Sequence, residues 1–388
     1  MSKGQYFTKN KKLKEKVFNL CKNKGKMFEP SAGPGYLSEY FKNNNRKIDV
    51  ALEIDNSLEL LDKEIIFKNF FDYSIDNKFD TIVGNPPYVK YQEIENENKI
   101  KSQFSSLNLY LYFIEKSFYH LSENGEIVFI IPRDFLTSTR AKGIRKLLFE
   151  NGTITNIIDF QEEKMFDDAD PYVIIIRYEK NNLSHKTNYE INGGSTEKKE
   201  VLSNGYLKYV KKEGRLLKDY FDIKVGIVSG ANSIFQNDSL GNISIICSDF
   251  ITTNKKKKYI FEENGNYSSK VWEYLNENKN ILINRKIRNF DDNNWFEWGA
   301  VRNISHMKKK GKAIYVNSKT RKEKPFFVED ITYFDGSILC LFPKNEEINI
   351  FEWCEKLNNN REGFMEQGFI VGNKYQFTQN SLSNLFVD

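Results

Sequence analysis

Residues 79–88 read Phe-Asp-Thr-Ile-Val-Gly-Asn-Pro-Pro-Tyr, and this stretch decides both the expected fold and the expected chemistry. Its apolar middle predicts a short buried strand, and the prolines prevent that strand from continuing. Open α/β folds bind ligands at the carboxyl ends of their strands, where Asn85 would then lie. Asn85 Oδ1 and the Pro86 carbonyl can each accept one hydrogen of a planar NH₂ group, and Tyr88 offers a stacking face. The alternative is a plain Pro-Pro turn with a packed tyrosine.

A turn of small residues precedes this stretch. Residues 29–35 read Glu-Pro-Ser-Ala-Gly-Pro-Gly and follow a short candidate strand at 26–28. Small residues let the backbone come close to a ligand, and a helix that begins near Tyr36 would add free N–H groups. The next strand ends in Glu53, 18 residues after Gly35. That is close to the spacing at which an acidic residue binds ribose hydroxyls in Rossmann-like units; the alternative is an ordinary strand-end carboxylate.

The order of apolar segments predicts an α/β fold with a doubly wound, mostly parallel sheet of the Rossmann-like kind. In such a sheet Asn85 and the Gly33–Gly35 turn share one edge, so their side chains and amides would meet. Further strands are expected at 65–72, 126–132, 154–158 and 172–176, and helices at 9–20, 107–121 and 140–149.

The length of 388 residues predicts two domains, which we place at 1–213 and 214–388. The total charge of +5 says little about partners, but its distribution is uneven. Between residues 252 and 324 there are 18 Lys and Arg against 8 Asp and Glu, with aromatic residues among them. This pattern favours a surface that binds nucleic acid; the alternative is a solvated lysine-rich surface.

Cysteine and histidine are sparse. Four widely spaced cysteines and three histidines predict neither a disulfide framework nor a zinc site. The chain has no apolar signal region and no run of 18 apolar residues, so we expect a soluble cytoplasmic protein without membrane contact.

These residues resemble the N6-adenine DNA methyltransferases of bacterial restriction–modification systems. Among them they resemble the γ class, in which the cofactor motifs come before the catalytic motif. The matches run through most of residues 4–178 and more loosely through 215–388. The resemblance implies an S-adenosylmethionine-dependent methyltransferase domain followed by an α+β target-recognition domain that binds double-stranded DNA.

The resemblance also assigns roles to residues. The catalytic set is Asn85, Pro86, Pro87, Tyr88 and Phe166, with the flipped base between Tyr88 and Phe166. The set around S-adenosylmethionine is Thr8, Glu29, Pro30, Ser31, Ala32, Gly33, Gly35, Glu53, Ile54, Asn69, Phe70 and Asn85. The family usually has aspartate where Asn69 stands, so Asp72 is an alternative partner for the cofactor's amino group. Phe166 has the further alternative of a simple loop anchor.

The C-terminal part resembles target-recognition segments, for which we expect DNA contacts from basic and aromatic residues. They are Trp298, Arg302, Lys308, Lys312, Lys319 and Arg321. A separately encoded restriction endonuclease is a possible partner, and we expect a monomer on DNA. A fused nuclease is not expected, because the methyltransferase motifs already begin at Gly4 and no Asp…Glu-x-Lys pattern follows.

Other interpretations of the Asn-Pro-Pro-Tyr stretch remain open. An RNA base, a protein glutamine amide and N4 of cytosine all present the same planar NH₂ group. A methyltransferase-like subunit that binds DNA without turnover is the alternative outside enzymes.

Overall fold

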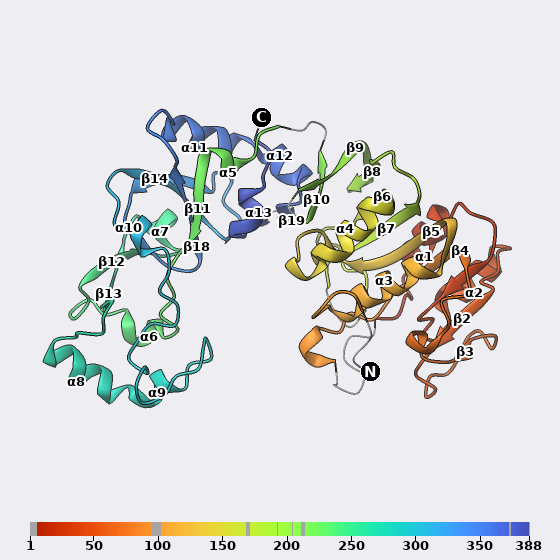
Figure 1. The fold of residues 1–388 in the computed structure, drawn as a ribbon, viewed down its shortest axis with the longest axis horizontal. Coiled ribbons are helices and arrows are strands. Elements are labelled where there is room, and N and C mark those ends of the chain that lie inside the picture. Colours follow the sequence, from red (N-terminus) through yellow and green to blue (C-terminus); the bar gives the residue numbers. More distant parts are fainter. Residues whose placement is uncertain are drawn as a thin grey trace. The chain divides into compact units, whose positions relative to one another are not determined.

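A ten-stranded sheet is the centre of the first part of the chain (Figure 1). Its strand order is β10-β9-β8-β6-β7-β5-β4-β1-β2-β3. The strands are β1 (Met27–Glu29), β2 (Val50–Glu53), β3 (Ile66–Phe67), β4 (Phe79–Gly84), β5 (Leu121–Pro132), β6 (Gly152–Asp159), β7 (Val173–Lys180), β8 (Lys186–Ile191), β9 (Gly194–Ser203) and β10 (Tyr206–Val210).

Strand direction changes within this sheet. All neighbours from β3 to β5 are parallel, whereas β7 is antiparallel to both β5 and β6. The α/β prediction is therefore confirmed, but "mostly parallel" holds only for part of the sheet. Parallel neighbours need a long crossover, usually a helix. The described residues between β6 and β7 form no helix, and the chain returns antiparallel.

The computed structural model describes residues 6–94, 102–167, 171–191, 193–203, 205–210, 214–371 and 374–387. Gly4, where the expected methyltransferase motifs begin, lies outside them. The chain divides into two compact units, residues 1–213 and residues 214–388. Among the described residues, no helix combines the length and the apolar character needed to cross a bilayer.

Helices cover both faces of the sheet of the first unit. Side chains of α1 (Lys11–Leu20) and α2 (Tyr36–Asn43) pack on the face that presents Val83 and Val128. The other face, with Ile82 and Ile127, packs against α3 (Leu109–His120) and α4 (Lys142–Asn151). Successive strand residues point to opposite faces, so both faces of β4 and β5 are apolar, as a strand buried between helices requires.

The expected strand at 65–72 is shorter than predicted. It ends as β3 at Phe67, and residues Phe70–Asp72 form a 3₁₀ turn. Asn69 Oδ1 accepts a hydrogen bond from the Phe71 amide at 3.0 Å. Asparagine side chains commonly bond to the backbone two residues on, and this bond turns the chain out of the strand.

The second unit combines short helices with three small sheets, in agreement with an α+β fold. Their orders are β11-β18-β14-β16, β13-β12-β17 and β15-β20-β19. The strands are β11 (Phe221–Val225), β12 (Ile243–Ile246), β13 (Lys257–Tyr259), β14 (Lys312–Asn317), β15 (Lys319–Thr320), β16 (Phe326–Asp330), β17 (Tyr333–Phe334), β18 (Ile338–Pro343), β19 (Ile370–Val371) and β20 (Lys374–Gln376). The helices are α5 (Leu217–Tyr220), α6 (Asn232–Phe235), α7 (Phe250–Thr253), α8 (Ser269–Glu277), α9 (Lys279–Ile283), α10 (Ile304–Met307), α11 (Ile350–Asn359), α12 (Arg361–Glu366) and α13 (Gln379–Ser383).

Candidate active site at the strand ends

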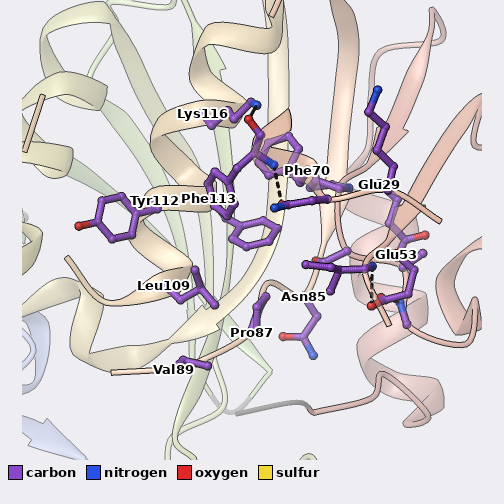
Figure 2. Close-up of a pocket in the computed structure, with 18 of the residues that line it drawn as sticks. Glu29, Glu53, Phe70, Asn85, Pro87, Val89, Leu109, Tyr112, Phe113 and Lys116 are labelled. Atoms are coloured by element: carbon purple, nitrogen blue, oxygen red, sulfur yellow. Dashed lines mark hydrogen bonds between the residues drawn. The ribbon is translucent and has the colours of Figure 1, made fainter. Parts of the chain in front are cut away.

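Three neighbouring parallel strands bring polar groups to one edge of the sheet. Strand β1 ends at Glu29, β2 ends at Glu53, and β4 is followed directly by Asn85. All three line one cavity of about 1160 Å³. Figure 2 shows the two glutamates on one side of this cavity and Leu109 and Phe113 of α3 on the other.

The turn after β1 has the geometry of a ligand cradle. Gly33 and Gly35 have φ angles of 56° and 100°, which favour glycine. A Cβ on Gly33 would lie 3.0 Å from the Phe7 ring, so the turn is also closely packed. Ser31 lines the cavity, and its buried Oγ has no hydrogen-bond partner among the described residues. A buried hydroxyl without a protein partner needs an ordered water, an ion or a ligand atom to complete it.

Glu53 is held rigidly at the end of β2. Its Oε2 accepts from the Gly33 amide at 2.7 Å, and its Oε1 accepts from the Ile54 and Asp55 amides, both at 2.9 Å. An ionised carboxylate has about four acceptor positions, so one remains for a ligand hydroxyl. Glu53 thus ties the glycine turn to the strand that carries it.

Glu29 differs from Glu53 because it is deeply buried. Burial, together with the charge of Glu53, raises the pKa of Glu29 from 4.5 to about 8, although a bond from Ser38 Oγ at 2.9 Å opposes this. The carboxyl group is therefore mostly neutral near pH 7. A cation bound beside it would lower this pKa again, because an opposite charge favours the ionised form.

The far end of the cavity is apolar with a few polar groups. Ile54 is 65% exposed and lines the cavity, as expected of a side chain that a flat ligand covers, whereas Phe70 also lines it but is only 2% exposed. Asn69 Oδ1 is already bonded to the Phe71 amide. Asp72 lines the same cavity and is exposed, so its carboxylate remains the better acceptor for a ligand amino group.

Asn85 is bonded to residues near the start of the chain, which we call the arm (residues 6–8). Its Nδ2 donates to the Tyr6 carbonyl at 2.6 Å and lies 3.3 Å from Thr8 Oγ1. Its Oδ1 accepts from the Tyr88 hydroxyl at 2.6 Å. Burial raises the pKa of Tyr88 well above 10, so this hydroxyl keeps its proton. Among the described residues, none donates a hydrogen bond to the Pro86 carbonyl oxygen.

Most of the residues predicted for the cofactor, and Pro87 of the predicted catalytic set, lie together. Those that line the cavity are Thr8, Glu29, Pro30, Ser31, Ala32, Gly33, Glu53, Ile54, Asn69, Phe70, Asn85 and Pro87. Gly35 lies behind the turn, where it caps the start of α2. Pro86, Tyr88 and Phe166 also lie outside the cavity lining. Phe166 is only 9% exposed and packs in the core that includes Val173.

The sequence reasoning missed one wall of the cavity. Helix α3 supplies Leu109, Tyr112, Phe113, Glu115, Lys116 and Tyr119 to the lining. Lys116 Nζ donates to the Phe71 carbonyl at 2.7 Å and lies 5.1 Å from the Phe70 ring centre. Burial lowers the pKa of Lys116 to about 8. The signal was a lysine and a glutamate side by side in an otherwise apolar helix.

One residue predicted to contact DNA cannot do so in this structure. Trp298 is 3% exposed, and its Nε1–H donates to the Ile260 carbonyl at 3.0 Å within a cluster of aromatic rings. It is a core residue, so that prediction is wrong. The other five predicted contacts are exposed: Arg302, Lys308, Lys312, Lys319 and Arg321. Lys308 pairs with Glu263, and Lys312 pairs with Asp330 at 2.7 Å.

The chain is similar to methyltransferases of restriction–modification systems. Residues 5–166 match the family described as Eco57I restriction-modification methylase. The chain is 25% identical to the type II methyltransferase M.HindII of Haemophilus influenzae, over 99% of this chain and 89% of that protein. It is 27% identical to the type II restriction enzyme and methyltransferase RM.Eco57I of Escherichia coli, over 54% of this chain and 22% of that protein.

A solved structure has a similar fold along almost the whole chain. It is that of the type IIL restriction-modification enzyme MmeI in complex with DNA, with a TM-score of 0.64 and 12% sequence identity. The similarity covers 97% of this chain and 63% of MmeI. At this identity the similarity shows the fold alone.

Proposed function

We propose that this chain, which is a methyltransferase of the restriction–modification type, methylates N6 of a flipped adenine in double-stranded DNA. The methyl donor is S-adenosylmethionine. The observation that carries the proposal is the place of Asn85. It follows β4 at the strand-end edge and shares a cavity with Glu53 and the glycine turn.

The residues of the cavity fit S-adenosylmethionine. The unpartnered Ser31 Oγ and the close turn at Gly33 suit the methionine part. Glu53 has one acceptor position left for a ribose hydroxyl, and Ile54 with Phe70 can cover the adenine. When bound, the cofactor supplies an electrophilic methyl group on a sulfonium.

The chain's own groups would activate the target nitrogen. The lone pair of an adenine amino group is delocalised into the ring, so the nitrogen is a poor nucleophile. Asn85 Oδ1 and the Pro86 carbonyl would accept its two hydrogens and stabilise the positive charge that develops in the transition state. Tyr88 and Phe166 would hold the base by stacking, which offsets the few kcal/mol of unstacking.

The second unit is proposed to recognise the DNA target. Its exposed lysines and arginines suit phosphate contacts, which fix the position of a protein on the duplex. We propose that the protein acts as a monomer in the cytoplasm beside a separately encoded restriction endonuclease.

The test is methyl transfer to unmodified genomic DNA, measured by mass spectrometry of the nucleosides. The comparison includes Asn85→Ala and, as a matched control, Asn151→Ala at the exposed end of α4. We expect N6-methyladenine with the unaltered protein and with Asn151→Ala, and none above background with Asn85→Ala.

Other outcomes separate the alternatives. Methylcytosine in place of methyladenine, or methylation only in a parallel RNA sample, would keep the mechanism and replace the substrate. No methylated base, with intact cofactor binding, would favour a protein glutamine substrate or a binding subunit without turnover.

A further inference from the structure

The ring of Tyr6 contacts both aromatic rings assigned to the target base. Its centre lies 5.1 Å from that of Tyr88 and 5.4 Å from that of Phe166, with tilts of 39° and 38°. These separations are those of packed aromatic pairs. A ring that contacts both partners takes up room beside each of them, and a base that stacks on either ring from that side needs the same room.

The carboxamide of Asn85, one of the two groups assigned to the target amino group, also makes hydrogen bonds within the chain. Asn85 Oδ1 accepts from the Tyr88 hydroxyl at 2.6 Å, and Asn85 Nδ2 donates to the Tyr6 carbonyl at 2.6 Å. The Tyr6 ring therefore lies where we expect the ring of the base. The Tyr6 carbonyl accepts a hydrogen bond from the Asn85 carboxamide. A planar ring flanked by two aromatic rings and a carboxamide is the arrangement expected of a bound adenine.

We propose that Tyr6 fills the target-base slot as a stand-in and leaves it when the flipped adenine enters. This inference rests on the proposed function and assigns Tyr6 as a further residue of its target site. Tyr6 keeps the rings of Tyr88 and Phe166 separated and excludes water from between them, so the slot is already formed when the base arrives. Exchange replaces one packed ring by another, so within the slot only the difference between their packing free energies opposes base entry.

Two features of the structure would allow this exchange: a second acceptor for the Tyr88 hydroxyl and the partial exposure of Tyr6. The Tyr88 hydroxyl lies 3.2 Å from the Ile130 carbonyl, so it keeps a partner when it releases Asn85 Oδ1. Tyr6 is partly exposed and precedes α1 by only a few residues. Tyr6 itself belongs to no helix or strand, so its ring can move without the loss of a backbone hydrogen bond inside one.

The first experiment measures binding of free adenine by calorimetry, with sinefungin present to saturate the cofactor site. In the unaltered protein we expect weak binding, because Tyr6 competes. In Tyr6→Ala the slot is empty, and we expect adenine to bind roughly tenfold more tightly, in line with the stacking contribution of a single base. Equal adenine affinity in both proteins would overturn the proposal.

Two further variants distinguish the target slot from a general apolar void. Tyr6→Ala combined with Asn85→Ala should lose the gained affinity, because the amino group of adenine loses its acceptor. Phe7→Ala removes the next ring of the arm, which packs on Gly33, and should show no gain. A gain in either variant would mean that adenine binds in such a void, and the proposal would be wrong.

Methyl transfer supplies a second, separate readout. If Tyr6 is a stand-in, Tyr6→Ala should raise kcat/KM for DNA several-fold, because base entry no longer displaces a ring. If Tyr6 is instead a permanent wall of the slot, kcat/KM should fall, and the proposal is wrong. Absence of transfer by the unaltered protein would contradict the proposed function, whereas the adenine measurement would still decide the role of Tyr6.

Discussion

The two halves of the site are prepared in different ways. The proposed cofactor half, which is the cavity lined by Glu53, Ile54 and the turn at Gly33, is open, and Ile54 is 65% exposed there. The target half is filled, since Tyr6 packs on Tyr88 and Phe166. A free small molecule can enter a preformed cavity. A base must first leave the duplex, and a slot kept in shape by a removable side chain suits that order of events.

Asn85→Ala should produce the largest effect and should separate the two halves. Loss of one preorganised dipole at the target nitrogen should lower kcat by about 10² to 10³. Cofactor affinity, measured by calorimetry with sinefungin, should change by less than about threefold, because Glu53 and the glycine turn stay in place. An equal loss of both quantities would contradict the division into halves.

Glu53→Gln should affect the opposite half. The carboxylate accepts three backbone bonds, and glutamine has one acceptor oxygen in place of two. We expect the sinefungin Kd to rise roughly 10- to 100-fold, as for loss of hydrogen bonds to a charged group. At saturating cofactor, kcat should recover. Glu59→Gln, an exposed carboxylate nearby in sequence, is the control and should bind normally.

Phe7→Ala should have a smaller effect on the cofactor half. The Phe7 ring lies against Gly33, within 3.0 Å of where a Cβ would stand. Removal of this cover should raise the sinefungin Kd by roughly fivefold, the equivalent of about 1 kcal/mol of lost contact. Its neighbour Tyr6 also lines the cavity but packs on Tyr88 and Phe166, so Tyr6→Ala should raise this Kd by less than Phe7→Ala does. Matching effects from both variants would mean that the arm acts as one unit.

The strand-end cavity and the residues that line it could be predicted from sequence better than the contacts of Tyr6. The α/β sheet with its strand-end glycine turn is confirmed, and the fold is similar to that of a solved restriction–modification enzyme. It could be predicted because strand ends and glycine turns depend on local sequence pattern. The contact of Tyr6 with Tyr88 joins residues far apart in sequence, and no local pattern reveals it. The prediction that Trp298 contacts DNA was wrong, because an aromatic residue among lysines looks like a base-stacking residue in the sequence. The sequence does not reveal that its indole N–H donates to a buried backbone carbonyl.

The smallest effect concerns the pH dependence of the cofactor half. Glu29 has a pKa of about 8 in the folded protein against an ordinary value of 4.5, so the folded state binds the extra proton between these values. Stability should therefore fall as pH rises from about 4.5 to about 8. The side chain in Glu29→Gln does not titrate, so the variant avoids this loss of stability. Its Tm should exceed that of the unaltered protein by a few degrees near pH 8. Burial also raises the pKa of Glu200, but Glu200 is present in both proteins, so its effect cancels in the difference between their Tm values.

Ligand binding should change this pH dependence, because Glu29 lines the cofactor cavity. Sinefungin carries ammonium groups, and a cation bound near Glu29 would favour the ionised carboxylate. Binding should therefore release the proton of Glu29 and flatten the pH dependence of Tm in the unaltered protein. A Tm difference between the two proteins that is independent of pH would mean that Glu29 is already ionised in the folded state, with its burial relieved by a partner in the empty site.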